Sequence, residues 1–169
     1  MKLFYTTIIM SAIAIVFLSF RTAPAIATGD KFNPNATSKM IPPCLQMHYC
    51  IEKYAEEYDV PKQYAYGIAK QETEYRGPFQ WSYNQSRISP VGALGAMQIM
   101  PSTAKLMWPR RKVTREMLLN DIDFNVQTSM KIIRHLYNTY GSWKLAFGAY
   151  NTGRPMVNGY AINVFNHQP

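Results

Sequence analysis

The sequence predicts a mostly α-helical domain with little or no β-sheet. After residue 47, apolar residues recur in several stretches at the three- and four-residue spacing of amphipathic helices. Gly, Pro and cap-forming polar residues separate these stretches, and the chain has neither an internal repeat nor a convincing alternating pattern. A chain of 169 residues is long enough for one domain with a real hydrophobic core.

Residues 1–27 have the composition of a signal peptide. Lys2 opens a short basic region, residues 3–20 are almost wholly apolar, and the small residues of 23–27 offer cleavage sites. An uncleaved anchor is the alternative, since an apolar run of 18 residues is at the lower edge of what spans a bilayer. The alanine-rich end favours cleavage, so we expect an exported monomer with no stable membrane insertion after cleavage.

The chain is basic, with a formal net charge of +8 that becomes +6 once Lys2 and Arg21 are lost with residues 1–27. An exported basic protein is attracted to an anionic surface or polymer such as a cell wall. A generally cationic soluble surface is the alternative. Nucleic acid is a poorer partner, because no Lys/Arg cluster alternates with stacking aromatics in a recognisable module.

Cys44 and Cys50 are the two cysteines, and export permits a disulfide. In one continuous helix their Cα atoms would be about 9 Å apart, beyond the ~7 Å limit for a bridge. Either Cys44 precedes the helix or both thiols are free. His48 lies between them, but a structural zinc needs four ligands and the sequence has no second His/Cys cluster. We therefore expect no metal and no cofactor.

The N-terminal part of the domain is predicted as a lead-in followed by two helices. Residues 28–42 are polar with Pro and Asn, which predicts a flexible segment. Apolar spacing predicts a helix over 47–58, and Pro61 begins a second that ends near Arg76 and Gly77.

The middle of the chain is predicted to be less regular. Residues 79–91 are irregular, although their alternating aromatics allow a short strand, and 92–101 are rich in small residues that permit close backbone approach. Ser102 would cap a helix over 103–107. A basic surface loop at 110–115 and a short helix at 116–119 follow.

The C-terminal part is predicted to hold the longest helix, over 121–140, with Gly141 as its stop. Ser142 would cap the next helix, over 143–150, and residues 157–165 would form a truncated final helix.

Glu72 stands out because it continues an apolar stripe of the second helix. It follows Ile68 by four residues and Ala69 by three. Glu74 falls on the other side, where Lys70 would pair with it. A carboxylate among apolar neighbours keeps its proton to higher pH, as a general acid requires. The plainer reading is a glutamate at a helix end that turns out to water.

Glu72 belongs to the first of three short sequence blocks that are considered together. They are Gln71-Glu72-Thr73, a stretch from Ser89 to Ala104 that contains Gly-Ala-Met-Gln, and Ala149-Tyr150-Asn151-Thr-Gly153. In content and order they resemble the signature blocks of the soluble lytic transglycosylase family. Asp121 and Asn125 resemble a further Asp-x-x-x-Asn element of that family.

The resemblance implies a lysozyme-like helical fold with an active-site cleft, over residues 43–166, in the periplasm or extracellular cell-wall space. It implies cleavage of the β-1,4 bond between N-acetylmuramic acid and N-acetylglucosamine in peptidoglycan glycan strands, with a 1,6-anhydro product. Glu72 would be the single catalytic acid/base, held by the Tyr150 hydroxyl. The substrate-binding residues carried over from the family are Ser89, Met97, Gln98, Tyr150 and Asn151.

The chain departs from the family pattern in several places. Thr73 replaces the usual Ser, and Ala96 replaces the usual Leu. An insertion between Glu72 and Ser89 makes Ser89 the least secure assignment. Its aromatics either stack on sugar rings or pack the inserted loop; they are Phe79, Trp81 and Tyr83.

The distribution of acids fits a mechanism with one carboxylate. Most glycosidases use two, yet the next acid after Glu74 is Glu116, and capping explains Asp121 and Asp123 at a helix start. Two other functions remain open on the sequence: a hydrolase of the same fold, if water reaches the site, and a non-catalytic wall-binding protein that retains the cleft.

Overall fold

A computed structural model describes residues 41–168. The predicted signal peptide and nearly all of the predicted lead-in lie outside these residues. Within them the chain forms helices and no strand, which confirms the helical class. The helices are α1 (Pro43–Glu57), α2 (Lys62–Thr73), α3 (Pro101–Met107), α4 (Arg115–Asn120), α5 (Ile122–Tyr140), α6 (Trp143–Thr152) and α7 (Gly159–Phe165). None of the helices in 41–168 is long and apolar enough to cross a membrane.

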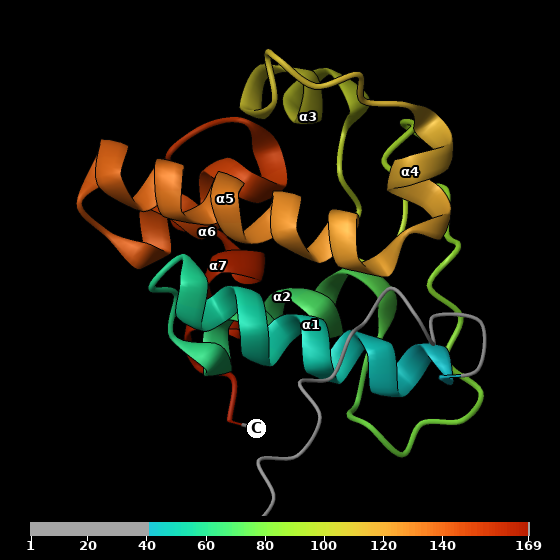
Figure 1. Cartoon of the computed structure of the whole chain (residues 1–169). Coiled ribbons are helices and arrows are strands. Elements are labelled where there is room, and N and C mark those ends of the chain that lie inside the picture. Colours follow the sequence, from blue (N-terminus) through green and yellow to red (C-terminus); the bar gives the residue numbers. More distant parts are fainter. Residues whose placement is uncertain (1–40, 169) are drawn as a thin grey trace, which may run out of the picture. The chain divides into compact units, whose positions relative to one another are not determined.

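Helix α5 is the centre of the domain. Figure 1 shows it crossing between α1 on one side and α3 and α4 on the other, and it packs against all three and against α6. Helix α2 packs against α1 and α7. The facing sides of these helices are apolar, and burial of that surface supplies most of the stabilising free energy. Fully buried side chains of the core include Met47, Ile51, Ile68, Phe124, Met130, Ile133 and Phe147.

Helix α2 ends earlier than predicted, at Thr73. Glu74 adopts a left-handed conformation with φ of 59°, which ends the helix. Because the chain leaves the helix at Glu74, the Glu74 carboxylate pairs with Arg87 at 3.4 Å and not with Lys70 as predicted. Both charged groups of this pair are exposed, so it contributes little to stability.

Helix caps also differ in detail from the predictions. Met100 occupies the N-cap of α3, with Pro101 in its first turn, so Ser102 is not the cap. Asp121 caps α5 as predicted, and its carboxylate accepts a hydrogen bond from the Phe124 N–H at 3.0 Å. Gly141 ends α5 with φ of 66°, again as predicted.

The inserted segment forms turns, so the short strand allowed by its alternating aromatics is not present. Phe79 and Trp81 are exposed, whereas Tyr83 is buried against Tyr75. Further along, single bridges join Ile88 to Leu94 and Leu94 to Ile99, without extending into a strand.

Both cysteines lie in α1 and are buried, free thiols. Of the two sequence alternatives, the structure therefore has the free pair. Burial raises the pKa of Cys50 to about 12, with further contributions from Asp123, so this thiol is not a nucleophile at neutral pH.

Candidate active site

Glu72 lies in the last turn of α2, on the same face as the fully buried Ile68 and Ala69. Burial raises the pKa of its carboxyl to about 7, although a hydrogen bond from Tyr160 opposes the shift. The protonated and ionised forms are therefore both populated near neutral pH. The stripe in the sequence predicted this environment, and the alternative of a glutamate turned out to water is wrong.

No second carboxylate among residues 41–168 contributes to the pKa shift of Glu72. Asp121 is used as a helix cap, and Asp123 accepts a hydrogen bond from the Tyr54 hydroxyl at 2.6 Å. Both acids lie at the N-terminus of α5, as predicted: Asp121 is the cap and Asp123 is in the first turn. Among the carboxyls of residues 41–168, Glu72 is the one whose pKa is raised.

Tyr160 is the residue that holds the Glu72 carboxylate. Its hydroxyl donates to Glu72 Oε1 at 2.7 Å from the first turn of α7. The prediction that Tyr150 makes this bond is wrong. The two partners are 88 residues apart in the chain, and the only sequence signal for Tyr160 is its place beside Ala161 and Val164 in a short apolar helix, where a buried hydroxyl needs a partner.

Tyr150 makes a different connection. Its hydroxyl donates to the Met97 carbonyl at 2.8 Å and shares a hydrogen bond with the Ser129 hydroxyl at 2.8 Å. Burial raises the pKa of Tyr150, and the charge of Glu72 raises it further, as both also do for Tyr160. Both tyrosines therefore stay protonated and lie within electrostatic reach of Glu72.

The glycine-rich segment forms a tight loop against α5. Backbone hydrogen bonds of 3.0 and 2.9 Å join Leu94 and Ile99 across it. The Asn125 side chain clamps the loop by accepting from the Met97 N–H at 2.8 Å and donating to the carbonyls of Leu94 and Leu118 at 2.9 and 2.7 Å. This is the role that the structure gives to the Asp-x-x-x-Asn element.

Gly95 is required where this loop meets α4 and α5. It has φ of 78°, and a Cβ atom there would lie 2.0 Å from the Leu118 carbonyl oxygen and 2.5 Å from Asn125 Nδ2. Any side chain would push the loop away from the helices. Gly95 thus provides the close backbone approach that was predicted for the second sequence block, whereas a Cβ atom at Gly92 would meet nothing within 4 Å.

Thr73 ties this loop to the end of α2. Its hydroxyl lies 2.8 Å from the Ala96 carbonyl oxygen and 2.9 Å from the Tyr83 hydroxyl. The residue that follows Glu72 is therefore fixed both to the glycine-rich loop and to the inserted segment.

The structure places the other predicted site residues as follows. Met97 is fully buried, so its side chain fills the core. The Ser89 hydroxyl accepts from the Ala93 N–H at 2.9 Å, and the Gln98 amide donates to the Gly95 carbonyl at 2.8 Å, so both stabilise their own loop. Asn151 is exposed at the end of α6.

Asn151 is connected through Asn158 to the first turn of α7, the helix that carries Tyr160. Its side-chain oxygen accepts from the Asn158 amide at 3.1 Å. The Asn158 oxygen in turn accepts from the Ala161 N–H at 2.9 Å and caps α7, the helix that carries Tyr160. The described residues contain no group of three or more His, Cys, Asp or Glu side chains suited to a metal ion.

Fold and site together define a small helical domain in which one glutamate of raised pKa accepts a hydrogen bond from a tyrosine and lies next to a residue that contacts the glycine-rich loop. Residues 49–167 match the family model described as the Transglycosylase SLT domain, and the chain belongs to this family.

Relatives and solved structures agree with this assignment. The chain is 30% identical over 116 residues to the soluble lytic murein transglycosylase of Escherichia coli (strain K12), which covers 66% of this chain and 17% of the relative. The crystal structure of the 70 kDa soluble lytic transglycosylase from Escherichia coli matches with a TM-score of 0.54 at 28% identity, over 69% of this chain and 18% of that one. A complex of the 70 kDa soluble lytic transglycosylase with bulgecin A gives the same values. The predicted lysozyme-like helical fold is confirmed, and the match spans less than a fifth of each of these larger proteins.

Proposed function

We propose that this domain is a peptidoglycan lytic transglycosylase that uses Glu72 as its single acid and base. The observation that carries the proposal is a partly buried carboxyl whose pKa lies near 7, bonded to Tyr160 and without a second carboxylate to influence it. Membership of the transglycosylase family and relatives named as murein transglycosylases support the substrate class.

In the first step, protonated Glu72 donates its proton to the glycosidic oxygen as the bond to C1 of N-acetylmuramic acid breaks. The N-acetyl carbonyl of the sugar stabilises the cation that develops at C1, the task that a second carboxylate performs in other glycosidases. The Tyr160 hydroxyl donates to the Glu72 carboxylate that this step leaves.

In the second step, the Glu72 carboxylate accepts the proton of the C6 hydroxyl of the same sugar. The C6 oxygen forms a bond to C1 and closes the 1,6-anhydro ring. Glu72 is then protonated again, and no water is consumed. One group serves both steps because its pKa lies near the working pH.

The glycine-rich loop and its neighbours would form the groove for the glycan strand. Ser89, Gln98 and Asn151 are at least partly accessible and are proposed to contact sugar. The proposed roles of Met97 and Tyr150 are indirect, since Met97 is buried and the Tyr150 hydroxyl fixes its carbonyl. This substrate requires export to the periplasm or cell-wall space, in agreement with the predicted signal peptide.

Digestion of purified peptidoglycan followed by mass spectrometry tests the proposal. The wild-type protein should release muropeptides that are one water lighter than hydrolysis products and lack a reducing end, and Glu72→Gln should release them at least about 100-fold more slowly. Products with a reducing end would instead show a hydrolase, and equal wall clearing by both proteins would show that Glu72 is not catalytic. Bulgecin A, with which the 70 kDa soluble lytic transglycosylase forms a complex, should also bind this domain, and calorimetry measures that binding without turnover.

A further inference from the structure

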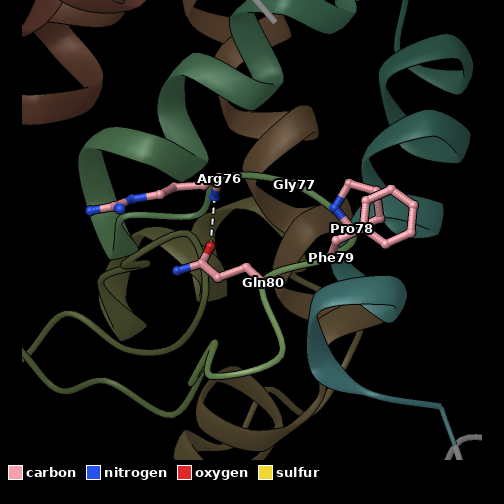
Figure 2. Close-up of a pocket in the computed structure, with 5 residues that line it drawn as sticks. All are labelled: Arg76, Gly77, Pro78, Phe79 and Gln80. Carbon is pink, nitrogen blue, oxygen red and sulfur yellow. Dashed lines mark hydrogen bonds between the residues drawn. The ribbon is translucent and has the colours of Figure 1, made fainter.

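A turn in the inserted segment presents two aromatic rings to solvent. Phe79 is 77% exposed and Trp81 is 64% exposed, and their ring centroids lie 6.5 Å apart with the planes at 61°. The turn borders a pocket of about 340 Å³ lined by Arg76, Gly77, Pro78, Phe79 and Gln80 (Figure 2). This volume is in the range of ligand sites, and exposed Phe and Trp rings offer flat apolar surface for contact with a ligand.

Hydrogen bonds hold the turn in place. The Gln80 side-chain oxygen accepts from the Arg76 N–H at 2.7 Å, as Figure 2 shows, and its amide donates to the Glu74 carbonyl at 3.2 Å. A turn fixed in advance loses less conformational entropy on binding. Figure 2 also shows Phe79 beside Pro78, with the Arg76 side chain directed away from them.

The turn is attached to the catalytic end of α2. Glu74 follows Glu72 by two residues, and the buried Tyr83 beyond the turn bonds to Thr73. Phe79 follows Glu72 by seven positions, so their Cα atoms lie within about 25 Å of each other. A polysaccharide of several rings spans such a distance.

The charge of this segment suits an anionic glycan. Residues 75–115 contain seven Lys and Arg residues and no Asp or Glu. Arg76 and Arg87 flank the aromatic turn, and both are exposed, with Arg87 paired to Glu74. Peptidoglycan strands carry carboxylates on their peptide stems, and their sugar rings have apolar faces that stack on Trp and Phe.

We propose that Phe79 and Trp81 form a sugar-binding subsite outside the catalytic centre, which stacks on a ring of the glycan strand cleaved at Glu72. The proposal rests on the proposed function for the identity of the polymer. The subsite binds by contact and does not take part in the chemistry. Loss of the subsite should therefore weaken the binding of long glycan strands.

Binding to purified peptidoglycan in the Glu72→Gln background tests the subsite without turnover. Phe79→Ala combined with Trp81→Ala should weaken cosedimentation with peptidoglycan about tenfold, the loss expected from one or two stacking contacts. Leu106→Ala is the matched control, since Leu106 is 75% exposed outside the turn, and it should bind as the parent does. Thermal unfolding should be unchanged in both, because neither removes a buried side chain.

The subsite is overturned if the double variant binds peptidoglycan as tightly as its parent, or if the parent does not bind it. It is also overturned if the double variant loses binding only to vesicles with anionic phospholipid, which would make the turn a membrane contact. Release of anhydro products by the wild-type protein is measured separately. If the wild-type protein releases anhydro products normally but the double variant binds as its parent does, only the subsite is contradicted. If the double variant binds more weakly but the wild-type protein releases no anhydro product, only the transglycosylase activity is contradicted.

Discussion

Glu72 and Glu52 are two glutamates in similar contacts with opposite properties. Each accepts a hydrogen bond from a tyrosine hydroxyl, from Tyr160 at 2.7 Å and from Tyr66 at 2.9 Å. Lys62 lies 2.5 Å from Glu52. Burial raises the pKa of Glu52, but the hydrogen bonds from Lys62 and Tyr66 outweigh burial and lower it.

For Glu72, burial outweighs its tyrosine, and the pKa rises to about 7. No ion pair to Glu72 occurs in residues 41–168. A hydrogen bond from a tyrosine therefore orients a carboxylate but does not by itself determine its protonation state at neutral pH. Burial without a cation is what gives Glu72 the pKa of an acid catalyst.

The largest expected difference between the two glutamates is in activity. Glu72→Gln should lower turnover of peptidoglycan by about 100-fold or more, because the amide neither donates nor accepts the required proton. Glu52→Gln should leave turnover within about twofold, since a surface pair contributes little. The release of soluble muropeptides over time measures both. A comparable loss in the two variants would show that the contrast in pKa has no catalytic meaning.

The next largest effect is on stability as a function of pH. A carboxyl whose folded pKa is raised from 4.5 to about 7 stabilises the fold fully below pH 4.5, and this contribution is lost as pH rises through 7. Glutamine resembles the protonated form and avoids the loss. Glu72→Gln should therefore be more stable than wild type above neutral pH by on the order of 3 kcal/mol, with little difference in acid. Urea unfolding at two pH values measures this.

Removing each tyrosine hydroxyl sharpens the comparison further. The bond from Tyr160 lowers the pKa of Glu72, so Tyr160→Phe should shift the alkaline limit of activity to higher pH. It should also reduce turnover by about tenfold, because the carboxylate loses a hydrogen bond of about 1.4 kcal/mol. Tyr66→Phe is the matched control and should move neither quantity. A pH–rate profile that is identical in wild type and Tyr160→Phe would show that Tyr160 does not influence the catalytic carboxyl.

A smaller effect is expected from the cap of α7. Asn158→Ala removes the side-chain oxygen that accepts from the Ala161 N–H, and loss of an N-cap costs about 1 kcal/mol. Asn158→Asp keeps the cap and should restore the stability. Thermal unfolding of the pair measures the cap, and a difference in the alkaline limit of activity between them would show that α7 positions Tyr160.

The smallest expected effect is at Glu52 itself. Lys62→Gln removes the cation that lowers the pKa of Glu52, so that pKa should rise towards its ordinary range. The change in stability should be small, since the pair lies at the surface and solvent screens it. NMR titration of the Glu52 carboxyl measures the shift, and an unchanged pKa would contradict the role assigned to the cation.

The features that sequence predicted are those set by local periodicity. The order of the helices, the stop at Gly141 and the cap at Asp121 follow from spacing within one or two turns. The burial of Glu72 follows from the same stripe. Such features require only that each helix packs its apolar face inward.

The features that sequence did not predict depend on how distant segments meet. Tyr160 reaches Glu72 because α7 packs against α2, and no periodicity reports such packing. Tyr150 was placed on Glu72 by family resemblance, yet its hydroxyl is used by Ser129 and the Met97 carbonyl. The direction of Glu74 was missed because a left-handed conformation at a residue other than glycine is uncommon.

A measurement of the pKa of the Glu72 carboxyl tests most directly whether Glu72 can act as the acid. An NMR titration that follows side-chain carboxyl carbons, with Glu72→Gln to assign the signal, reports this group alone. We predict a midpoint of about 7. A midpoint at the ordinary value of 4.5 would mean that Glu72 is ionised at neutral pH and cannot act as the acid, and would contradict this prediction.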